Sequence, residues 1–363
     1  MIRPSLLLFC CVLAGCAARP DTRTIWPVGA STTQGETERI FVATTRGTAT
    51  IPADGFTSLR SPQPHFAEFA VSIPPDHVPG EIEWPKGPTN PRTDFAVASH
   101  TRLDEKAFIR RVNAASENST GVFVHGYNYN FPEALFRTAQ MTADAQISDA
   151  PVLFSWPSSA SLLGYASDRE SVTYSRDALA ELLTRLADTS GGKPVTVFGH
   201  SMGGWLVMET LRQMRIAGED EALSRLEVVL AAPDIDVDVF RQQLAVIGRM
   251  EIPMVIMVSP DDRALGLSAL AGQRTRVGAL DITDPAVQVA AQQNNMVLID
   301  ISAVDASSSL NHDRYIQLAS AFPALARETR QGSTFTEAGA FVLSSTGQLL
   351  SAPLRVVDAA LGQ

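Results

Sequence analysis

Residues 199–203 read Gly-His-Ser-Met-Gly, the types and spacing of a nucleophilic serine held on a tight turn. They lie between a predicted strand, residues 195–198, and a predicted helix, residues 204–216. In such a turn a strained backbone lifts the serine hydroxyl clear of the sheet, and the flanking glycines avoid clashes. The first N–H groups of the helix point toward developing negative charge. The motif therefore predicts that Ser201 attacks a carbonyl carbon and forms an acyl-enzyme.

A second segment has the form of an oxyanion loop. The apolar run Val-Phe-Val at 122–124 leads into His125, Gly126 and Tyr127. In folds of this kind a loop after such a strand supplies one backbone donor, and the residue after the nucleophile supplies the other. We expect the N–H groups of Tyr127 and Met202 to fill these roles. The side chain of His125 lies upstream of the nucleophile, and we interpret it as bracing the loop rather than as a base.

The serine also needs a general base, and the expected chain order is serine, acid, histidine. Of the six histidines, only His312 lies after the later predicted strands. Its loop can fold over the carboxyl edge of the sheet toward Ser201, so we take His312 as the base. His200 lies inside the turn itself, and we interpret it as structural, with its side chain pointing away from the serine.

Two segments offer the acid. Asp261 and Asp262 follow the apolar run 254–258; we take Asp262 as the acid and Asp261 as a turn or cap residue. Asp234 and Asp236 follow the preceding run, 226–230, and compete for the role, although helix capping or a loop function suits them better. From the residues alone, Asp234 stays open as the rival to Asp262.

The segments that must position these residues alternate between short apolar runs and helical patterns from residue 120 onward. Continuous apolar runs are typical of strands buried on both faces of a parallel sheet. The predicted strands are 122–124, 152–154, 195–198, 226–230, 254–258 and 296–299, and helices are predicted at 131–145, 175–188 and 204–216. This order predicts a mostly parallel, doubly wound α/β sheet with helices on both faces. Earlier strands are predicted at 40–44, 65–72 and 94–98.

Taken together, these motifs resemble a bacterial branch of the α/β-hydrolase superfamily that is esterase- or lipase-like and has no assigned function. The resemblance rests on 123–128 (Phe-Val-His-Gly-Tyr-Asn), 154–158 (Phe-Ser-Trp-Pro-Ser), 199–203 and 230–236 (Leu-Ala-Ala-Pro-Asp-Ile-Asp). The segments 40–46 and 259–265 match as well, and the latter favours Asp262 as the acid. The resemblance implies the α/β-hydrolase fold and a serine hydrolase with Ser201, Asp262 and His312 as its triad. It implies neither a metal nor a cofactor, and it names no substrate.

The N-terminus indicates export and a lipid anchor. Arg3 precedes a short apolar stretch, residues 4–13, which is typical of a secretory signal and too short to span a bilayer. Residues 13–16, Leu-Ala-Gly-Cys, resemble the lipobox of bacterial lipoproteins, which implies cleavage before Cys16 and lipid attachment to it. Ala17 rather than aspartate follows, and by resemblance to enterobacterial sorting this favours the outer membrane. We expect a protein anchored there by lipid and facing the periplasm.

Composition bounds the remaining possibilities. The 363 residues are 45% hydrophobic and 19% charged, which suits a large folded core, and the formal net charge of −10 argues against a nucleic-acid partner. All three cysteines lie within the first sixteen residues, so the rest of the chain has neither a disulfide framework nor a cysteine-ligated metal. We divide the chain into a signal (1–15), a lipidated cysteine with a flexible tether (16–37), a hydrolase domain (38–330) and an extension without an assigned role (331–363).

Two function classes follow. The first is a serine esterase acting on a small-molecule or lipid ester in the cell envelope. The alternative is a catalytically silent scaffold or binding lipoprotein on the same fold, because fold does not fix function. The complete serine, acid and histidine set favours the enzyme, although thioester or amide hydrolysis and acyl transfer would use the same groups. The insertions 157–173 and 236–247 are candidates for a substrate wall or lid, with amphipathic helices that pack on the core as the equal alternative.

Overall fold

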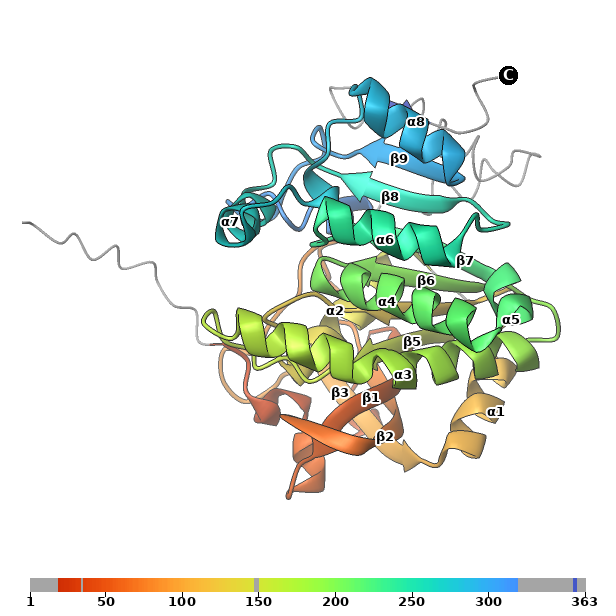
Figure 1. The fold of residues 1–363 in the computed structure, drawn as a ribbon. Coiled ribbons are helices and arrows are strands. Elements are labelled where there is room, and N and C mark those ends of the chain that lie inside the picture. Colours follow the sequence, from red (N-terminus) through yellow and green to blue (C-terminus); the bar gives the residue numbers. More distant parts are fainter. Residues whose placement is uncertain (1–18, 34, 147–149, 319–354, 358–363) are drawn as a thin grey trace, which may run out of the picture.

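A computed structural model describes residues 19–33, 35–146, 150–318 and 355–357 (Figure 1). Within these ranges one sheet has the strand order β10-β9-β8-β7-β6-β4-β5-β1-β2-β3. The strands are β1 Thr37–Thr48, β2 Phe56–Ser72, β3 Ala96–Leu103, β4 Thr120–Val124, β5 Ala150–Ser155, β6 Val195–His200, β7 Leu226–Ala231, β8 Met254–Val258, β9 Met296–Asp300 and β10 Arg355–Val357. In the centre of the sheet, neighbouring strands pair in parallel from β9 through β8, β7, β6, β4 and β5 to β1. At the edges, β2 pairs antiparallel with β1 and β3, and β10 pairs antiparallel with β9.

This sheet confirms the predicted fold class. Each apolar run from residue 120 onward lies in a parallel strand whose side chains are buried on both faces, as the absence of polar alternation indicated. The early strands differ in extent. The predicted strand 65–72 is the second half of the longer β2, and the strand predicted at 94–98 begins only at Ala96 and continues to Leu103.

Helices cover both faces of the sheet (Figure 1). They are α1 Glu105–Ala115, α2 Phe131–Asp144, α3 Tyr165–Thr189, α4 Met202–Ala217, α5 Asp220–Ser224, α6 Val237–Ile247, α7 Arg263–Gly272 and α8 Pro285–Gln293. The apolar sides of α3, α4 and α6 pack on one face, and α2 packs on the other. Strand β1 shows the consequence of burial on both faces: Phe41 and Ala43 belong to one core, and Ile40 and Val42 to the other.

The described part of the expected tether is an ordered segment, and this corrects the interpretation of residues 16–37 as flexible. Asp21 caps a 3₁₀ turn at Thr22–Ile25, and Ile25 is fully buried. Trp26 Nε1 donates to Asp54 at 2.7 Å, and Val28 N–H donates to the carbonyl of Val97 at 2.9 Å. Such attachment by single contacts leaves no apolar periodicity in the sequence, which is why pattern analysis missed it.

Other N- and C-terminal predictions lie outside the described residues. These are the signal (1–15), Cys16 and all of the extension 331–363 except residues 355–357, which form β10. Among the residues that the structure describes, no helix is both long enough and apolar enough to cross a bilayer.

Candidate active site

Ser201 lies on the turn between β6 and α4, in a backbone conformation that side chains rarely adopt. Its φ is 54° and its ψ is −120°, a left-handed region where a non-glycine residue is strained. The turn closes tightly: a Cβ on Gly203 would lie 2.3 Å from the carbonyl oxygen of Val124 and 2.4 Å from that of His125. Only glycine fits at that position, so the spacing of the motif follows from packing of the turn against the end of β4.

The loop after β4 lies directly against this turn. A Cβ on Gly126 would lie 3.1 Å from Ser201 Cβ and 2.8 Å from His200 Nδ1. Met202 is the first residue of α4, where backbone N–H groups have no partner within the helix. The backbone of the 125–127 loop and the start of α4 therefore flank Ser201 from two sides, which is the arrangement that an oxyanion hole requires.

His312 and Asp262 form a hydrogen-bonded pair. His312 Nδ1 lies 2.6 Å from Asp262 Oδ2, and the Asp262 side chain is fully buried. The other carboxylate oxygen of Asp262 accepts the N–H of Leu265 at 2.9 Å and so caps α7. Because the carboxylate is held at both oxygens, it fixes the imidazole orientation and leaves Nε2 available for proton transfer.

His200 connects this pair to the nucleophile turn, a role that the sequence analysis did not assign. Its Nε2–H donates to the backbone carbonyl of His312 at 3.2 Å, and the two rings lie 4.8 Å apart. On its other side it packs against Tyr315 at 4.3 Å. Burial, with His312 as a further cause, lowers the pKa of His200 well below its usual value, so it stays neutral. The residue before Ser201 thus positions the loop that carries His312.

Asp261 lies in a turn, as expected, which the N–H of Asp262 closes onto the carbonyl of Ser259 at 3.0 Å, and it also forms an ion pair. Arg314 binds its carboxylate with both terminal nitrogens, at 2.5 and 2.9 Å, and Asn311 Nδ2 donates to it at 3.1 Å. The hydrogen bond from Arg314 is the main reason that the pKa of Asp261 falls to about 2. This bidentate pair ties the loop after β9 to the end of β8 on both sides of His312.

Asp234, the rival acid, is committed elsewhere. It accepts hydrogen bonds from Tyr165 Oη at 2.8 Å and Ser268 Oγ at 2.7 Å, and it forms a buried ion pair with Arg276 at 3.3 Å. Burial raises the pKa of Tyr165 to about 12, so its hydroxyl keeps the proton that it donates. Asp236 caps α6 through the N–H groups of Asp238 and Val239. The carboxylate that meets His312 is that of Asp262.

A fully buried arginine from β1 binds the loop that follows β4. Arg46 of β1 donates to Ser155 Oγ at 2.8 Å and to the carbonyl of Tyr129 at 2.9 Å. His125 lies 3.3 Å from the same Ser155 hydroxyl and stacks on Trp156. Burial, with Arg46 as the next cause, lowers the pKa of His125 to about 3, so its imidazole is neutral and braces the loop. Burial also lowers the pKa of Arg46 to about 9.

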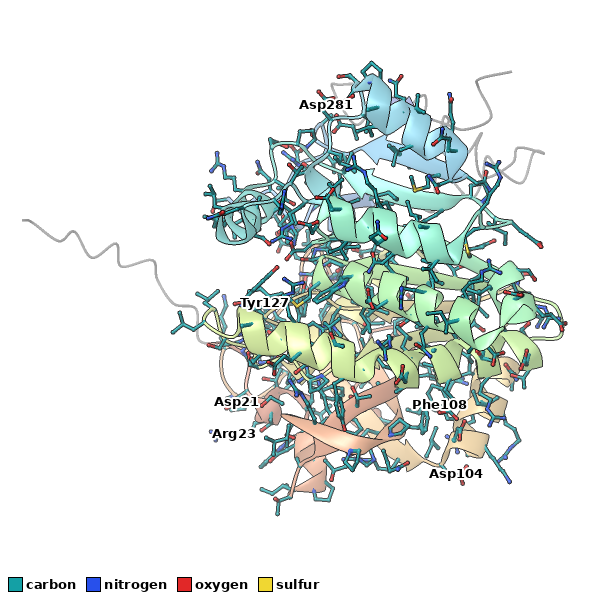
Figure 2. All side chains as sticks on the ribbon, in the orientation of Figure 1. Asp21, Arg23, Asp104, Phe108, Tyr127 and Asp281 are labelled. Carbon is teal, nitrogen blue, oxygen red and sulfur yellow. The ribbon has the colours of Figure 1, made fainter. Side chains whose placement is uncertain are left out.

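The side chain of Tyr127 has a separate set of contacts from those proposed for its backbone N–H. Figure 2 shows it at the end of the molecule where α3 begins. Its hydroxyl donates to the carbonyl of Ser161 at 2.8 Å, and its ring meets that of Tyr165. Tyr127 therefore joins the oxyanion loop to the insertion before α3. Across the residues that the structure describes, no group of three or more His, Cys, Asp or Glu side chains could hold a metal ion.

A strained serine turn between a parallel strand and a helix, with an acid and a histidine from later loops, defines the α/β-hydrolase class. The chain belongs to the family described as "Alpha/beta hydrolase of unknown function (DUF900)", whose sequence model matches residues 101–329. An uncharacterized protein of Nostoc sp. is 39% identical over 61 residues, which span 17% of this chain and 16% of that relative.

Solved structures similar to this chain include a putative hydrolase from Agrobacterium vitis, 14% identical, with a TM-score of 0.33, covering 79% of this chain and 98% of its own. A probable hydrolytic enzyme from Pseudomonas aeruginosa is 12% identical, with a TM-score of 0.35, covering 85% of this chain and 99% of its own.

Replacing Gly126 with valine tests the assignment of the oxyanion loop. A valine there meets Ser201 and His200, so we expect the loop to shift and turnover to fall by about 10²–10³, the usual effect of losing one donor. The matched control is Gly121→Val on β4, the strand that precedes this loop, because no atom lies within 4 Å of a Cβ at Gly121. Steady-state kinetics in which Gly126→Val matches Gly121→Val would contradict the assignment.

Proposed function

We propose that this hydrolase is a serine esterase that cleaves carboxylic esters through an acyl-enzyme. One observation carries the proposal: His312, hydrogen-bonded to Asp262 at 2.6 Å, is held through His200 beside the strained turn of Ser201. Nucleophile, base and orienting acid come from three separate loops at the carboxyl ends of β6, β8 and β9. A binding protein on the same fold has no need of a strained serine and a buried carboxylate on one histidine.

The proposed reaction proceeds in two halves. Ser201 Oγ bonds to the ester carbonyl carbon while His312 Nε2 takes its proton, and the N–H groups of Tyr127 and Met202 stabilise the oxyanion. His312 then gives the proton to the departing alkoxide, which leaves as an alcohol. Water, deprotonated by His312, attacks the acyl-enzyme and releases the acid, and the proton returns to Ser201. Asp262 holds the tautomer throughout and stabilises the imidazolium.

Labelling with a fluorophosphonate probe tests this function. We expect stoichiometric modification of the peptide that carries Ser201, followed by loss of activity on a series of p-nitrophenyl esters of increasing acyl length. The series then reports which acyl length the site accepts. A protein that binds the esters without turnover, and that resists the probe, would favour the silent scaffold instead.

We also propose that Cys16 carries the lipid anchor and holds the enzyme at the outer membrane, facing the periplasm. The support is the signal-like apolar run followed by Leu-Ala-Gly-Cys. We expect the wild-type protein to enter the detergent phase on phase partitioning and Cys16→Ala to remain aqueous or unprocessed. Fully aqueous behaviour of both proteins would refute the anchor.

A further inference from the structure

Arg19, at the start of the described chain, is bound to two loops beside the candidate active site. Its guanidinium forms a bidentate ion pair with Glu133, at 2.9 and 2.5 Å. It also donates to the side chain of Asn128 at 3.0 Å, to the backbone carbonyl of Asn128, and to the carbonyl of Ala160 at 2.5 Å. Asn128 follows Tyr127 directly, so the N-terminal segment docks one residue away from the proposed oxyanion donor.

These contacts leave only a short stretch of chain between the proposed anchor at Cys16 and the attached segment. The carbonyl of Pro20 accepts a hydrogen bond from Asn130 Nδ2 at 2.7 Å, and the turn that follows is fixed by buried Ile25. Cys16 precedes Arg19 by three positions, and three residues span at most about 11 Å. If Cys16 is lipidated, its acyl chains begin within that distance of Arg19, so the bilayer surface meets the protein beside the loops that Arg19 binds.

Exposed leucines lie on the segments that contact or carry the loops of the candidate site. Leu162 and Leu163, 80% and 97% exposed, lie in the insertion that Tyr127 and Arg19 bind through Ser161 and Ala160. Leu267 and Leu270, 62% and 77% exposed, lie on α7, the helix capped by Asp262, and Leu310 lies two residues before His312. Figure 1 shows α7 and the first turn of α3 at the end of the sheet toward which β8 and β9 point.

These segments form one rim. Tyr165 Oη lies 3.0 Å from Ser268 Oγ, which joins the start of α3 to α7, and Arg263 N–H donates to the carbonyl of Leu310 at 2.9 Å, which joins α7 to the His312 loop. Five exposed leucines in water are costly, and each gains free energy when it enters hydrocarbon. Arg19, three residues after the proposed anchor, contacts the segment that carries Leu162 and Leu163, so the membrane is the apolar phase nearest to these leucines.

We propose that this leucine rim (Leu162, Leu163, Leu267, Leu270 and Leu310) inserts into the membrane that holds Cys16, and that the substrate is an acyl ester of a membrane lipid. The proposal rests on the proposed esterase function and on the lipid anchor. An ester bond near the head group of a lipid then reaches Ser201 directly from the bilayer, and its acyl chain stays among the leucines rather than crossing water.

The orientation is tested by lipid quenching of a single fluorophore. Cys16 is the one cysteine after the signal, and lipid blocks its thiol, so a cysteine placed at Leu163 takes a thiol-reactive fluorophore alone. We expect nitroxide-labelled lipid in phosphatidylethanolamine–phosphatidylglycerol vesicles to quench the fluorophore in Leu163→Cys strongly. The matched control is Ile216→Cys at the far end of α4. Residue Ile216 is also exposed, at 56%, and a fluorophore there should not be quenched. Equal or absent quenching at both positions overturns the proposed orientation.

The substrate is tested with the same lipidated protein. We expect the double variant Leu162→Ser with Leu163→Ser to lose about tenfold more activity on vesicle phospholipid than on soluble p-nitrophenyl butyrate, because insertion of two leucines is lost. Ile216→Ser should leave both rates unchanged. Wild-type protein that cleaves the soluble ester but not the vesicle lipid overturns this inference and leaves the esterase intact. Cleavage of neither ester overturns the esterase and the lipid substrate together, while the quenching result still decides the orientation.

Discussion

Replacing Ser201 with alanine is expected to lower kcat/KM on a short-chain ester by about 10⁶-fold, because triad members act as one unit and the nucleophile has no substitute. Ser201 is 4% exposed, and its hydroxyl is small and neutral, so removing it leaves no unpaired charge and should leave the fold intact. His312→Ala should be nearly as damaging, and the double variant no worse than either single one. Kinetics together with fluorophosphonate labelling measure both effects.

Ser224→Ala is the matched control for this prediction. Ser224 ends α5, and its hydroxyl donates to the carbonyl of Glu221 in the same helix, so the substitution should leave both labelling and turnover unchanged. A Ser201→Ala protein that still accepts the probe would overturn the proposed mechanism.

Asp262→Asn is expected to reduce turnover by about 10⁴-fold without a large loss of stability. Asparagine removes the charge that orients and stabilises the protonated His312. It remains a good N-cap, so the hydrogen bond to Leu265 and the start of α7 should persist. The two carboxylate functions of this residue, catalysis and capping, are thereby separated by a single substitution.

The paired variant Asp234→Asn should behave in the opposite way. It weakens a buried ion pair with Arg276 and is expected to cost up to about 3 kcal/mol of stability, while the folded protein keeps most of its turnover. Measuring kcat/KM and Tm for both proteins on one ester distinguishes the two acids. A near-wild-type Asp262→Asn, or a 10⁴-fold loss confined to Asp234→Asn, would reverse the assignment.

The fold and the order of the reacting groups were predictable because both follow from local pattern. Buried parallel strands appear as unbroken apolar runs, and the serine turn needs glycine at fixed positions, so the sheet and the turn that carries Ser201 could be predicted from sequence alone, while the proposal of His312 follows from the expected chain order. The acid was harder, because Asp234, Asp261 and Asp262 all follow strands. Their partners distinguish them, and those partners, Arg276, Arg314 and His312, lie 42 to 53 positions away in the sequence.

The residues that sequence reasoning missed act through long-range contacts. Arg19 binds Glu133 and Ala160, and Arg46 binds Tyr129 and Ser155, pairs that no local periodicity can indicate. The structural role that the sequence predicts for His200 extends to the loop after β9, because the carbonyl that it binds belongs to His312. The common cause is that a single polar side chain, held by backbone carbonyls of distant loops, leaves no repeating signal in the chain.

The buried guanidinium of Arg46 also determines how far the protein can be shortened at its N-terminal end. The family model begins at residue 101, yet Arg46 comes from β1, which pairs with β5 in the middle of the sheet. A fragment cut at that boundary would lose both the strand and the cation, so the Tyr129 carbonyl would lose the guanidinium that donates to it and the Ser155 hydroxyl would keep its contact with His125 alone of these two partners. We therefore expect a protein cut at residue 101 to be unable to fold on its own, because it lacks a strand from the middle of the sheet and the arginine that supports the oxyanion loop.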